Sequence, residues 1–317
     1  MTSAPRLIIL ADSQKYSEIF LNRDIAAMSA DANIEVVYIR EVRIRIGLWR
    51  HLPIRVVRNR IAKQIIADKN IRREDTVLAY WSNYILDLAA IISRETGCKL
   101  QAFCHANDLF RRTYLGRIPP AEIDQYFFCC RKNIEWAQKA FSIPTEKISY
   151  RPHPLPNLPQ WKPPAASEFA ICNIARDVPK KNLDAVFNII DDLADSIPHI
   201  QFIQAGIHSR HTYRISRSNI EVKLPGPIPF SRVLEIMLQS HLFMYGSRID
   251  KTGDRDGVPN VLREAGEMGM PVVAEKGWAN DEVVFKGPAL LVGSLKDEKE
   301  RIKQWVRALY PAFFVGK

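Results

Sequence analysis

The stretch from Gly253 to Ala274, GDRDGVPNVLREAGEMGMPVVA, holds two carboxylates whose spacing could serve chemistry. Asp256 lies in a glycine-bearing loop, and Glu264 follows after seven intervening residues in a segment with helical periodicity. Two such acids can act together as general acid and base, or each can accept hydrogen bonds from hydroxyl groups, such as those of a sugar or a ribose. They can equally be ordinary solvated charges, and the residue types alone do not decide among these readings.

The elements around the two acids favour a binding site for an anion. The apolar run HLFMYGS before the loop reads as a strand, and Pro259 suits the first turn of the following helix, where its missing NH costs nothing. The unpaired amide groups and positive dipole end of that helix attract negative charge. Since open α/β folds bind ligands at the carboxyl edge of the sheet, we expect the ligand there.

Short β-rich runs alternate with helical periods along the chain, which predicts an α/β protein with parallel sheets covered by helices. The segment 150–168 has six prolines and no helical period, and so reads as an extended linker. We expect two Rossmann-like domains whose parallel sheets face each other across a cleft. The expected bounds are 1–150 for the N-terminal acceptor-side domain, 151–167 for the linker, 168–300 for the C-terminal donor-binding domain and 301–317 for a short helix or tail.

The bulk composition of the 317 residues points to an acidic partner and a reducing compartment. The formal charge of +10 suits a nucleotide diphosphate, an anionic membrane face or a nucleic acid. The five cysteines show no C-x-x-C spacing, so neither a disulfide framework nor a zinc site is predicted. No signal peptide is evident, and no window approaches the roughly 20 apolar residues of a transmembrane helix. We therefore expect a cytoplasmic protein, with at most peripheral contact at the inner face of the membrane.

The segment that follows Arg255, DGVPNVLREAGEMGMPVVA, resembles the E-x7-E segment of family 4 glycosyltransferases of the GT-B fold. The usual form in that family is close to E-G-x-P-N-V-L-L-E-A-M-A-x-G-x-P-V-V-A. The resemblance implies that Glu264 binds the ribose of a nucleotide-sugar donor and that Asp256 binds hydroxyls of the donor sugar. The sequence departs from the family at Asp256, where Glu is usual, and at Arg263. The further donor contacts that the resemblance implies are Gly257, Pro259, Asn260 and Val261.

A second segment, NIARDVPKKNLDAV, is similar to the family's G-R-L-x-x-K-K-G-x-D segment. The similarity implies that Arg176 and Lys181 lie at the donor diphosphate. Fixed cations there can stabilise the charge of a departing nucleoside diphosphate without a metal. Lys180 is expected to be a solvated surface charge. Asn182 replaces the usual glycine.

A third segment, FCHANDLF, resembles the family's H-A-x-D-I-F segment. A lone histidine is more often structural than catalytic, but His105 directly follows a predicted strand. The resemblance implies that His105 lies near the anomeric carbon of the donor and the acceptor. Asp108 is a second catalytic candidate that could instead cap the following turn.

The N-terminal segment SQKYSEIFLNRDIAAM resembles the opening found in the exopolysaccharide, colanic-acid-type branch of the family. Ser17 and Glu18 match that opening, whereas Ile19 replaces its usual threonine. Ser17 could equally be only the N-cap of a helix.

The segment from Arg40 to Gln64 is rich in Arg and Lys interleaved with apolar residues. It can lie on an anionic membrane surface, where a lipid-linked acceptor would be found, or its apolar residues can face the core of the domain. We weigh these two readings equally, and a nucleic-acid partner is the least favoured. The candidates for an acceptor or membrane side are Arg43, Arg45, Trp49 and Arg50.

Asp254 and Asp256 also form a D-x-D triplet, which chelates a divalent metal in a different glycosyltransferase fold. The two-domain pattern favours the metal-free reading, so we expect no metal and no cofactor beyond the donor substrate.

The resulting hypothesis is a retaining, hexosyl-type glycosyltransferase that moves a sugar from a nucleotide-diphosphate sugar to a polysaccharide or lipid-linked acceptor. The alternative is a catalytically idle GT-B protein, or a binding module that docks on membrane or nucleic acid through its basic N-terminal face.

Overall fold

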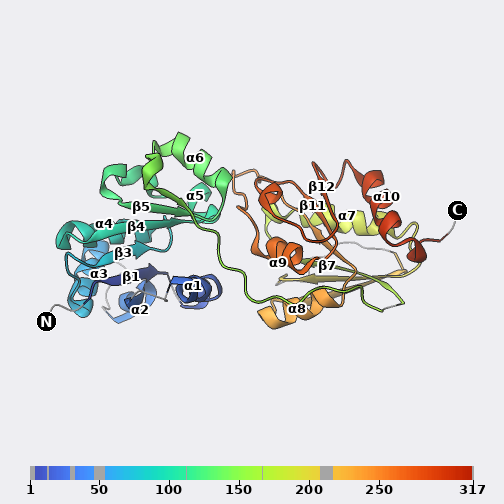
Figure 1. The fold of residues 1–317 in the computed structure, drawn as a ribbon, viewed down its shortest axis with the longest axis horizontal. Coiled ribbons are helices and arrows are strands. Elements are labelled where there is room, and N and C mark those ends of the chain that lie inside the picture. The colour runs from blue at the N-terminus through green and yellow to red at the C-terminus, as the bar shows by residue number, and fades with distance from the viewer. Residues whose placement is uncertain are drawn as a thin grey trace. The chain divides into compact units, whose positions relative to one another are not determined.

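The computed structural model describes residues 4–12, 14–28, 33–45, 54–111, 113–165, 167–207 and 217–315. The chain forms two compact units, Met1–Pro156 and Asn157–Lys317 (Figure 1). Each unit has its own six-stranded parallel sheet covered by helices. The prediction of two α/β units built on parallel sheets is therefore confirmed. The proline-rich segment has no regular secondary structure over 151–165, and the division between the units falls within it.

The sheet of the N-terminal unit has the strand order β2-β1-β3-β4-β5-β6, with every neighbouring pair parallel. Its strands are β1 (Arg6–Ala11), β2 (Asn33–Tyr38), β3 (Thr76–Ala79), β4 (Lys99–Cys104), β5 (Gln125–Phe128) and β6 (Ile148–Tyr150). The helices are α1 (Gln14–Met28), α2 (Ile39–Arg45), α3 (Ile54–Lys69), α4 (Tyr84–Thr96), α5 (Ala106–Arg111) and α6 (Arg131–Phe141). Short 3₁₀ turns are η1 (Leu115–Arg117), η2 (Pro120–Glu122) and η3 (Thr145–Lys147).

Side chains that alternate along the strands form a hydrophobic core on each face of this sheet. Ile8 and Leu10 of β1 belong to the larger cluster, with residues of α3 and α4, whereas Ile9 belongs to a smaller cluster with Leu21 of α1. Strands buried on both faces are typical of parallel sheets, and they explain why the β-rich runs in the sequence are almost continuously apolar.

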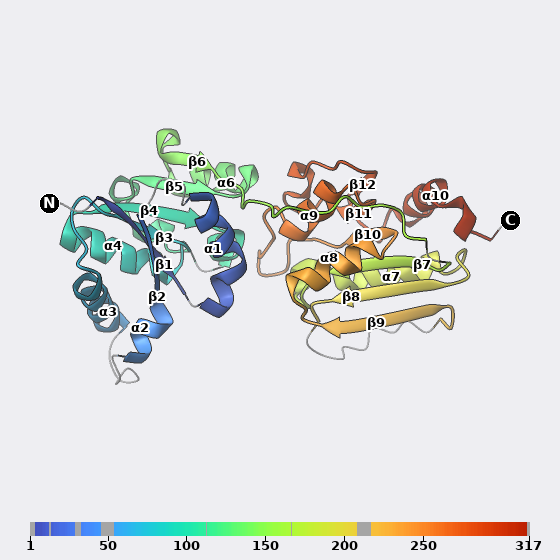
Figure 2. The same cartoon turned by 60° about the horizontal axis from the view of Figure 1, so that its bottom comes forward.

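The sheet of the C-terminal unit has the order β12-β11-β10-β7-β8-β9 (Figure 2). Its strands are β7 (Phe169–Ile174), β8 (Ile200–Ala205), β9 (Ile220–Gly226), β10 (Leu242–Tyr245), β11 (Val272–Glu275) and β12 (Ala289–Val292). The helices are α7 (Leu183–Leu193), α8 (Phe230–Leu238), α9 (Asn260–Met268) and α10 (Lys299–Leu309). The 3₁₀ turns are η4 (Pro179–Lys181), η5 (Asn280–Glu282) and η6 (Pro311–Phe313).

Two hydrophobic clusters cover the two faces of the second sheet. One contains buried residues of α7 and α10, and the other contains those of α8 and α9. Ile302 and Val306 of α10 are fully buried, so the C-terminal helix is part of this unit's core. Helix α9, which carries Glu264, is held by Leu262, Ala265 and Met268.

The basic segment of the sequence contributes one helix whose apolar residues face the core. Val57, Ile61 and Ile65 of α3 are buried, as the core-facing interpretation predicts. Arg58 donates hydrogen bonds to Asp87 Oδ2 at 2.6 Å and to the hydroxyl of Tyr114 at 2.7 Å, so its charge helps to hold the fold.

The structure describes only the backbone of two of the four candidates for the acceptor or membrane side. Arg43 and Arg45 lie in α2, but their side chains, like Trp49 and Arg50, are outside the described residues. Among the helices that the structure describes, none is both long enough and apolar enough to cross a bilayer.

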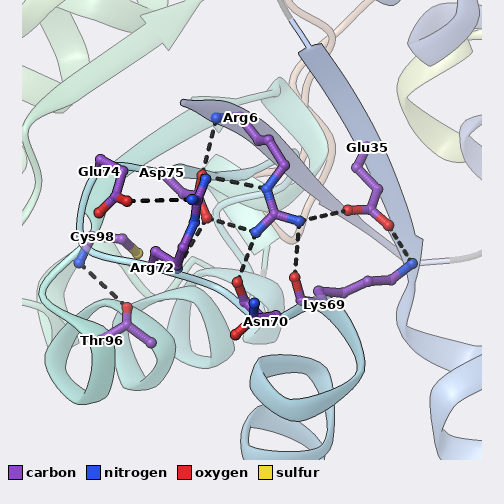
Figure 3. A network of polar contacts seen from close by, with 9 residues as sticks. All are labelled: Arg6, Glu35, Lys69, Asn70, Arg72, Glu74, Asp75, Thr96 and Cys98. Atoms are coloured by element: carbon purple, nitrogen blue, oxygen red, sulfur yellow. Dashed lines mark hydrogen bonds and ion pairs between the residues drawn. The ribbon is translucent and has the colours of Figure 1, made fainter. Parts of the chain in front are cut away.

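A charged network joins the start of β1 to the loop before β3 (Figure 3). The fully buried carboxylate of Asp75 accepts hydrogen bonds from the Arg6 amide at 3.0 Å, the Arg6 Nη2 at 2.7 Å and the Arg72 amide at 2.9 Å. Arg6 also donates to the carbonyl oxygens of Lys69 and Asn70, at the end of α3. One buried ion pair therefore fixes two neighbouring strands and a helix end relative to one another.

We expect Asp75→Asn to lower the free energy of unfolding by about 1.5–3 kcal/mol, because it removes the nearer of the two carboxylates that pair with Arg6 and leaves only Glu35, at 3.5 Å. Urea denaturation at pH 7 measures the loss. The control is Glu74→Gln, next to it in the chain, whose half-exposed side chain only contacts Arg72 at 3.5 Å and should cost less than about 1 kcal/mol. Equal losses in the two variants would contradict this account.

The same carboxylate predicts a dependence of stability on pH. Although burial raises it, hydrogen bonds from Arg6 and Arg72 lower the pKa of Asp75 from the ordinary 3.8 to about 2. Because the folded-state pKa is the lower one, the stabilisation is complete above pH 3.8 and is lost as the pH falls towards 2. Denaturation curves over this range should show the loss in the wild type and a smaller loss in Asp75→Asn.

Candidate functional site

The candidate donor site lies at the carboxyl ends of β7 and β10. The strand order places β10 and β8 on opposite sides of β7, so the chain connections diverge between β7 and β10, as they do where open α/β sheets bind ligands. Gly246 follows β10 directly, and a Cβ atom there would lie 2.7 Å from the carbonyl oxygen of Lys181. A glycine is thus required for the end of β10 to approach the loop that carries Lys181.

Three side chains meet at this point in a buried hydrogen-bonded group. Lys181 Nζ donates to Asp256 Oδ2 at 2.6 Å and to the hydroxyl of Tyr245. The Tyr245 hydroxyl in turn donates to Asp256 Oδ2 at 3.0 Å. Lys181 and Asp256, which the sequence assigned to the diphosphate and to the sugar, are therefore in direct contact with each other.

Burial and the neighbouring charges shift the pKa values of Lys181 and Asp256. Burial lowers the pKa of Lys181, and the charges of Lys180 and Arg176 lower it further, against the opposing effect of Asp256. Burial raises the pKa of Asp256, but Lys181 and Lys180 outweigh burial and hold that pKa below its ordinary value. Asp256 is therefore a carboxylate at neutral pH. Arg176 is exposed, and its charge reaches both Lys181 and Tyr245.

Lys180 is buried, so the expectation of a solvated surface charge is wrong. Its Nζ lies 3.1 Å from Asp254 Oδ1 and 3.4 Å from Asp256 Oδ1, and it donates to the carbonyl oxygen of Arg255. The reason is that the turn η4 packs against the loop of residues 254–256. Both carboxylates of the D-x-D triplet are thus paired with lysine.

Asn182 adopts the backbone conformation that explains the family's usual glycine. Its φ of 46° is in the left-handed region, where glycine is favoured and Asn is the commonest substitute. Its side-chain amide donates to both oxygens of the buried Glu275, at 2.9 and 2.8 Å. Glu275 also accepts from the amides of Ser247 and Leu295, so one carboxylate ties the Lys181 loop to the ends of β10 and β12.

We expect both Asn182→Gly and Asn182→Ala to destabilise the chain, because each removes two hydrogen bonds to a buried carboxylate. The alanine variant should be the less stable of the two by about 1 kcal/mol, since only it bears the strain of the left-handed backbone. Thermal or urea denaturation of the pair measures the difference. If the alanine variant proved as stable as the glycine variant, the backbone conformation assigned to residue 182 would be wrong.

Helix α9 begins where the sequence predicted. Pro259 is its N-cap residue, and Gly269, with φ of 79°, ends it. Glu264 is buried in the second turn with 4% of its surface exposed. Arg263, a departure from the family, donates to the side chain of Asn260 at 3.2 Å. Of the other predicted donor residues, Gly257 and Pro259 are buried, and Asn260 and Val261 are half-buried.

In the N-terminal unit, His105 directly follows β4 and is buried. Its Nε2 lies 2.9 Å from the carbonyl oxygen of Tyr80, and its ring stacks on Phe103 at a centroid distance of 4.8 Å. Burial, and to a smaller extent the charge of His153, holds the pKa of His105 well below its ordinary value. The imidazole is therefore neutral at physiological pH.

Asp108 lies inside the short helix α5 and is buried. Its Oδ2 accepts hydrogen bonds from the backbone amide of Ser82 and from the Ser82 hydroxyl, the latter at 2.8 Å. Burial raises the pKa of Asp108 to about 7. Asp108 does more than cap the following turn, because besides backbone amides at the start of its own helix it binds Ser82 in the loop after β3.

Comparison with known proteins identifies the C-terminal unit. Residues 168–310 match the family described as "Glycosyl transferases group 1". The chain is a glycosyltransferase. This match covers most of the unit that contains the Lys181, Asp256 and Glu264 side chains. Among curated proteins, none matches the sequence.

Solved structures extend the likeness of this glycosyltransferase to both units. Anabaena HepE in complex with UDP-glucose has a TM-score of 0.68 at 16% identity, over 96% of this chain and 90% of that one. A glycosyltransferase from Rickettsia africae has a TM-score of 0.65 at 13% identity, over 97% and 89%. A UDP-forming α,α-trehalose-phosphate synthase from Burkholderia xenovorans gives 0.62 at 13%, over 96% and 91%. At these identities the likeness establishes the GT-B fold.

Sequence reasoning missed residues that contact the candidate site residues or their neighbours. Tyr245 ends β10, so the rule that ligands bind at the carboxyl ends of strands could have identified it. Glu275 ends β11 in the same way. For Asp24, which contacts His153 at 2.9 Å, no local signal exists, because the two residues come from distant parts of the sequence.

The N-terminal resemblance can be placed only in part. Helix α1 begins at Gln14, so Ser17 is inside the helix and the reading of Ser17 as its N-cap is wrong. The side chains of Ser17 and Glu18 are outside the described part of the chain.

Proposed function

We propose that this glycosyltransferase transfers a sugar, with retention, from a nucleoside-diphosphate sugar bound by the C-terminal unit. The observation that carries the proposal is the buried pair Lys180 and Lys181 with Arg176 nearby, at the ends of β7 and β10 and in the unit that matches the family. Asp254 and Asp256 already pair with the two lysines, and Arg176 adds a third positive charge beside them, which the negative charge of a diphosphate can neutralise. A metal ion is not needed to supply this positive charge.

In the proposed mechanism, Lys181 and Arg176 stabilise the negative charge that develops on the departing nucleoside diphosphate. The N-terminal end of α9, with Gly257, Pro259, Asn260 and Val261 around its first turn, adds the positive end of the helix dipole. Glu264 accepts hydrogen bonds from the ribose hydroxyls. Because Lys181 contacts Asp256 at 2.6 Å, the diphosphate must share this ammonium group with the carboxylate.

Asp256 is proposed to bind hydroxyls of the donor sugar. Its Oδ2 is engaged by Lys181 and Tyr245, and its Oδ1 lies 3.4 Å from Lys180 Nζ. The two ammonium groups and the hydroxyl fix the carboxylate in one orientation, which suits a group that must position a sugar ring. The Asp256 side chain, one methylene shorter than glutamate, is thus held rigidly by these hydrogen bonds and ion pairs.

On the acceptor side, we assign His105 to the attacking hydroxyl. Nε2 of the neutral imidazole donates a hydrogen bond to the carbonyl oxygen of Tyr80. The other ring nitrogen can then contact the hydroxyl of the sugar acceptor. Asp108, with its pKa of about 7, is proposed to hold the Tyr80–Ser82 segment in place beside His105. The acceptor is proposed to be a polysaccharide or lipid-linked saccharide, as in the exopolysaccharide branch.

Titration calorimetry with UDP tests the donor assignment, and hydrolysis of UDP-glucose tests turnover. We expect the wild type to bind UDP more tightly than uridine, since the diphosphate carries the interaction. If UDP and uridine bound equally, the phosphate site would be wrong. Binding without any hydrolysis or transfer, across several nucleotide sugars and acceptors, would instead favour the catalytically idle protein.

Peripheral membrane contact is a separate proposal, carried by Arg43, Arg45, Trp49 and Arg50 in the basic segment. Sedimentation with liposomes containing anionic lipid should show binding that weakens with salt. Replacing the four residues with Ser should reduce this binding. Absence of binding at low salt would remove this proposal and leave the donor site untouched.

A further inference from the structure

Three side chains able to bind a metal meet at the carboxyl ends of three neighbouring strands. His105 follows β4, Cys129 follows β5 and His153 comes shortly after β6. Because β4, β5 and β6 are adjacent and parallel, their carboxyl ends lie at one edge of the sheet. One ligand atom from each of the three residues lies within 4.8 Å of the other two.

Each imidazole is oriented through one ring nitrogen by a fixed acceptor. His153 Nδ1 lies 2.9 Å from Asp24 Oδ2, and His105 Nε2 lies 2.9 Å from the Tyr80 carbonyl oxygen. The Tyr80 hydroxyl donates to the same oxygen of Asp24, which fixes the carboxylate. Histidines that bind metals are usually held in this way, by a carboxylate or a carbonyl on the nitrogen away from the ion. The ligand bonds would come from the other nitrogens, Nδ1 of His105 and Nε2 of His153, and His153 would give up its present hydrogen bond with Cys129.

We propose that His105, Cys129 and His153 form a site for a divalent transition-metal ion of the zinc class. Two imidazoles and one thiolate are ligands that Zn²⁺ prefers, whereas Mg²⁺ and Ca²⁺ prefer oxygen. In a tetrahedral zinc site two such ligand atoms lie roughly 3.3–3.6 Å apart, so the side chains must move inwards by about 1 Å. The hydrogen bond between His153 and Cys129 is replaced by bonds of both to the ion. Although burial lowers it, Asp24 and Cys129 raise the pKa of His153 to about 9, so binding at neutral pH releases one proton from the imidazolium and one from the Cys129 thiol.

Three protein ligands leave one position of the tetrahedron for water or a hydroxyl group. The sequence did not predict this site because its ligands come from three separate strand ends and form no short motif. The site belongs wholly to the N-terminal unit, whereas the proposed donor residues are in the C-terminal unit. It therefore goes beyond the proposed function, and the metal site and the donor site can fail without each other. The metal site shares His105 with the proposed acceptor side, where an ion on Nδ1 would take the place assigned to the acceptor hydroxyl.

Cobalt(II) is the probe for the test, because thiolate coordination gives a charge-transfer band and tetrahedral geometry gives intense visible bands. The full-length chain, first treated with a chelator, is titrated with Co²⁺ and then with Zn²⁺. We expect one Co²⁺ per chain with both kinds of band, and complete loss of the bands when Zn²⁺ displaces the cobalt. A wild type that shows no charge-transfer band, or binds no Zn²⁺ by equilibrium dialysis, would overturn the proposal.

Variants distinguish this site from adventitious binding. Cys129→Ser should abolish the charge-transfer band and weaken Zn²⁺ binding at least tenfold. Asp24→Asn should weaken Zn²⁺ binding by about 10–100-fold and leave the cobalt band at saturation. The control is Cys98→Ser, a buried thiol of the same unit that precedes β4 and should keep the band.

Circular dichroism and UDP calorimetry on each variant show that the fold and the donor site remain. A band that persists in Cys129→Ser, or that disappears only in Cys98→Ser, would show that the ligands are wrong. We expect Cys129→Ser to bind UDP like the wild type, whether or not the metal site exists. Loss of UDP binding in this variant would therefore count against the donor assignment and not against the metal site.

Discussion

Replacing Lys181 by alanine is expected to lower kcat for sugar transfer by about 100–1,000-fold, the usual effect of removing one fixed donor that stabilises charge in a transition state. The cause is the loss of a buried ammonium group at the place where the departing diphosphate gains negative charge. The fold should survive, because Asp256 keeps its hydrogen bond from Tyr245 and its ion pair with Lys180 at 3.4 Å. Initial rates with UDP-glucose at saturating donor measure the effect.

The matched control is Lys251→Ala, an exposed lysine in the turn that precedes the Asp254–Asp256 triplet. It carries the same charge on the same connection, and its loss should change kcat less than about twofold, as for other exposed surface charges. Lys181→Arg should be intermediate, because it keeps the charge but changes the shape of the donor group. Equal kcat values for wild type and Lys181→Ala would remove Lys181 from the mechanism.

Much of the C-terminal fold was predictable because local signals agree there. Pro259 and Gly269 mark the two ends of α9, and the apolar runs on either side of it form β10 and β11. The left-handed backbone of Asn182 also has a sequence signal, since the family's usual residue there is glycine. In each case a property of the single residue sets the local conformation.

The partners of the site residues were not predictable in the same way. Lys180 and Lys181 are adjacent and identical in type, so nothing in the sequence shows that both point inwards. Their burial depends on Asp254 and Asp256, which are more than seventy positions away, as the separations of 74 and 75 show. The cluster of His105, Cys129 and His153 depends on sheet order in the same manner. Long-range pairing of charges is decided by topology, which no local pattern contains.

Replacing Glu264 by alanine is expected to weaken UDP binding by about 100-fold or more, since hydrogen bonds to a charged acceptor contribute about 1.5–3 kcal/mol each and a ribose diol offers two. Because ground state and transition state share the ribose contact, KM should rise more than kcat falls. The matched control is Glu267→Ala on the same helix, an exposed carboxylate that pairs with Lys286 at 2.5 Å and should leave UDP binding unchanged.

The ribose itself can be removed to separate a direct contact from a disturbance of helix α9. Calorimetry with 2′,3′-dideoxy-UDP should show weak binding to the wild type, and Glu264→Ala should weaken it little further, because the hydroxyls that the carboxylate binds are already absent. The two changes would then be strongly coupled in a double-mutant-style cycle. If Glu264→Ala weakened UDP and its dideoxy analogue by the same factor, Glu264 would act through the packing of α9. In that case the ribose assignment would be wrong, although the diphosphate site at Lys181 would stand.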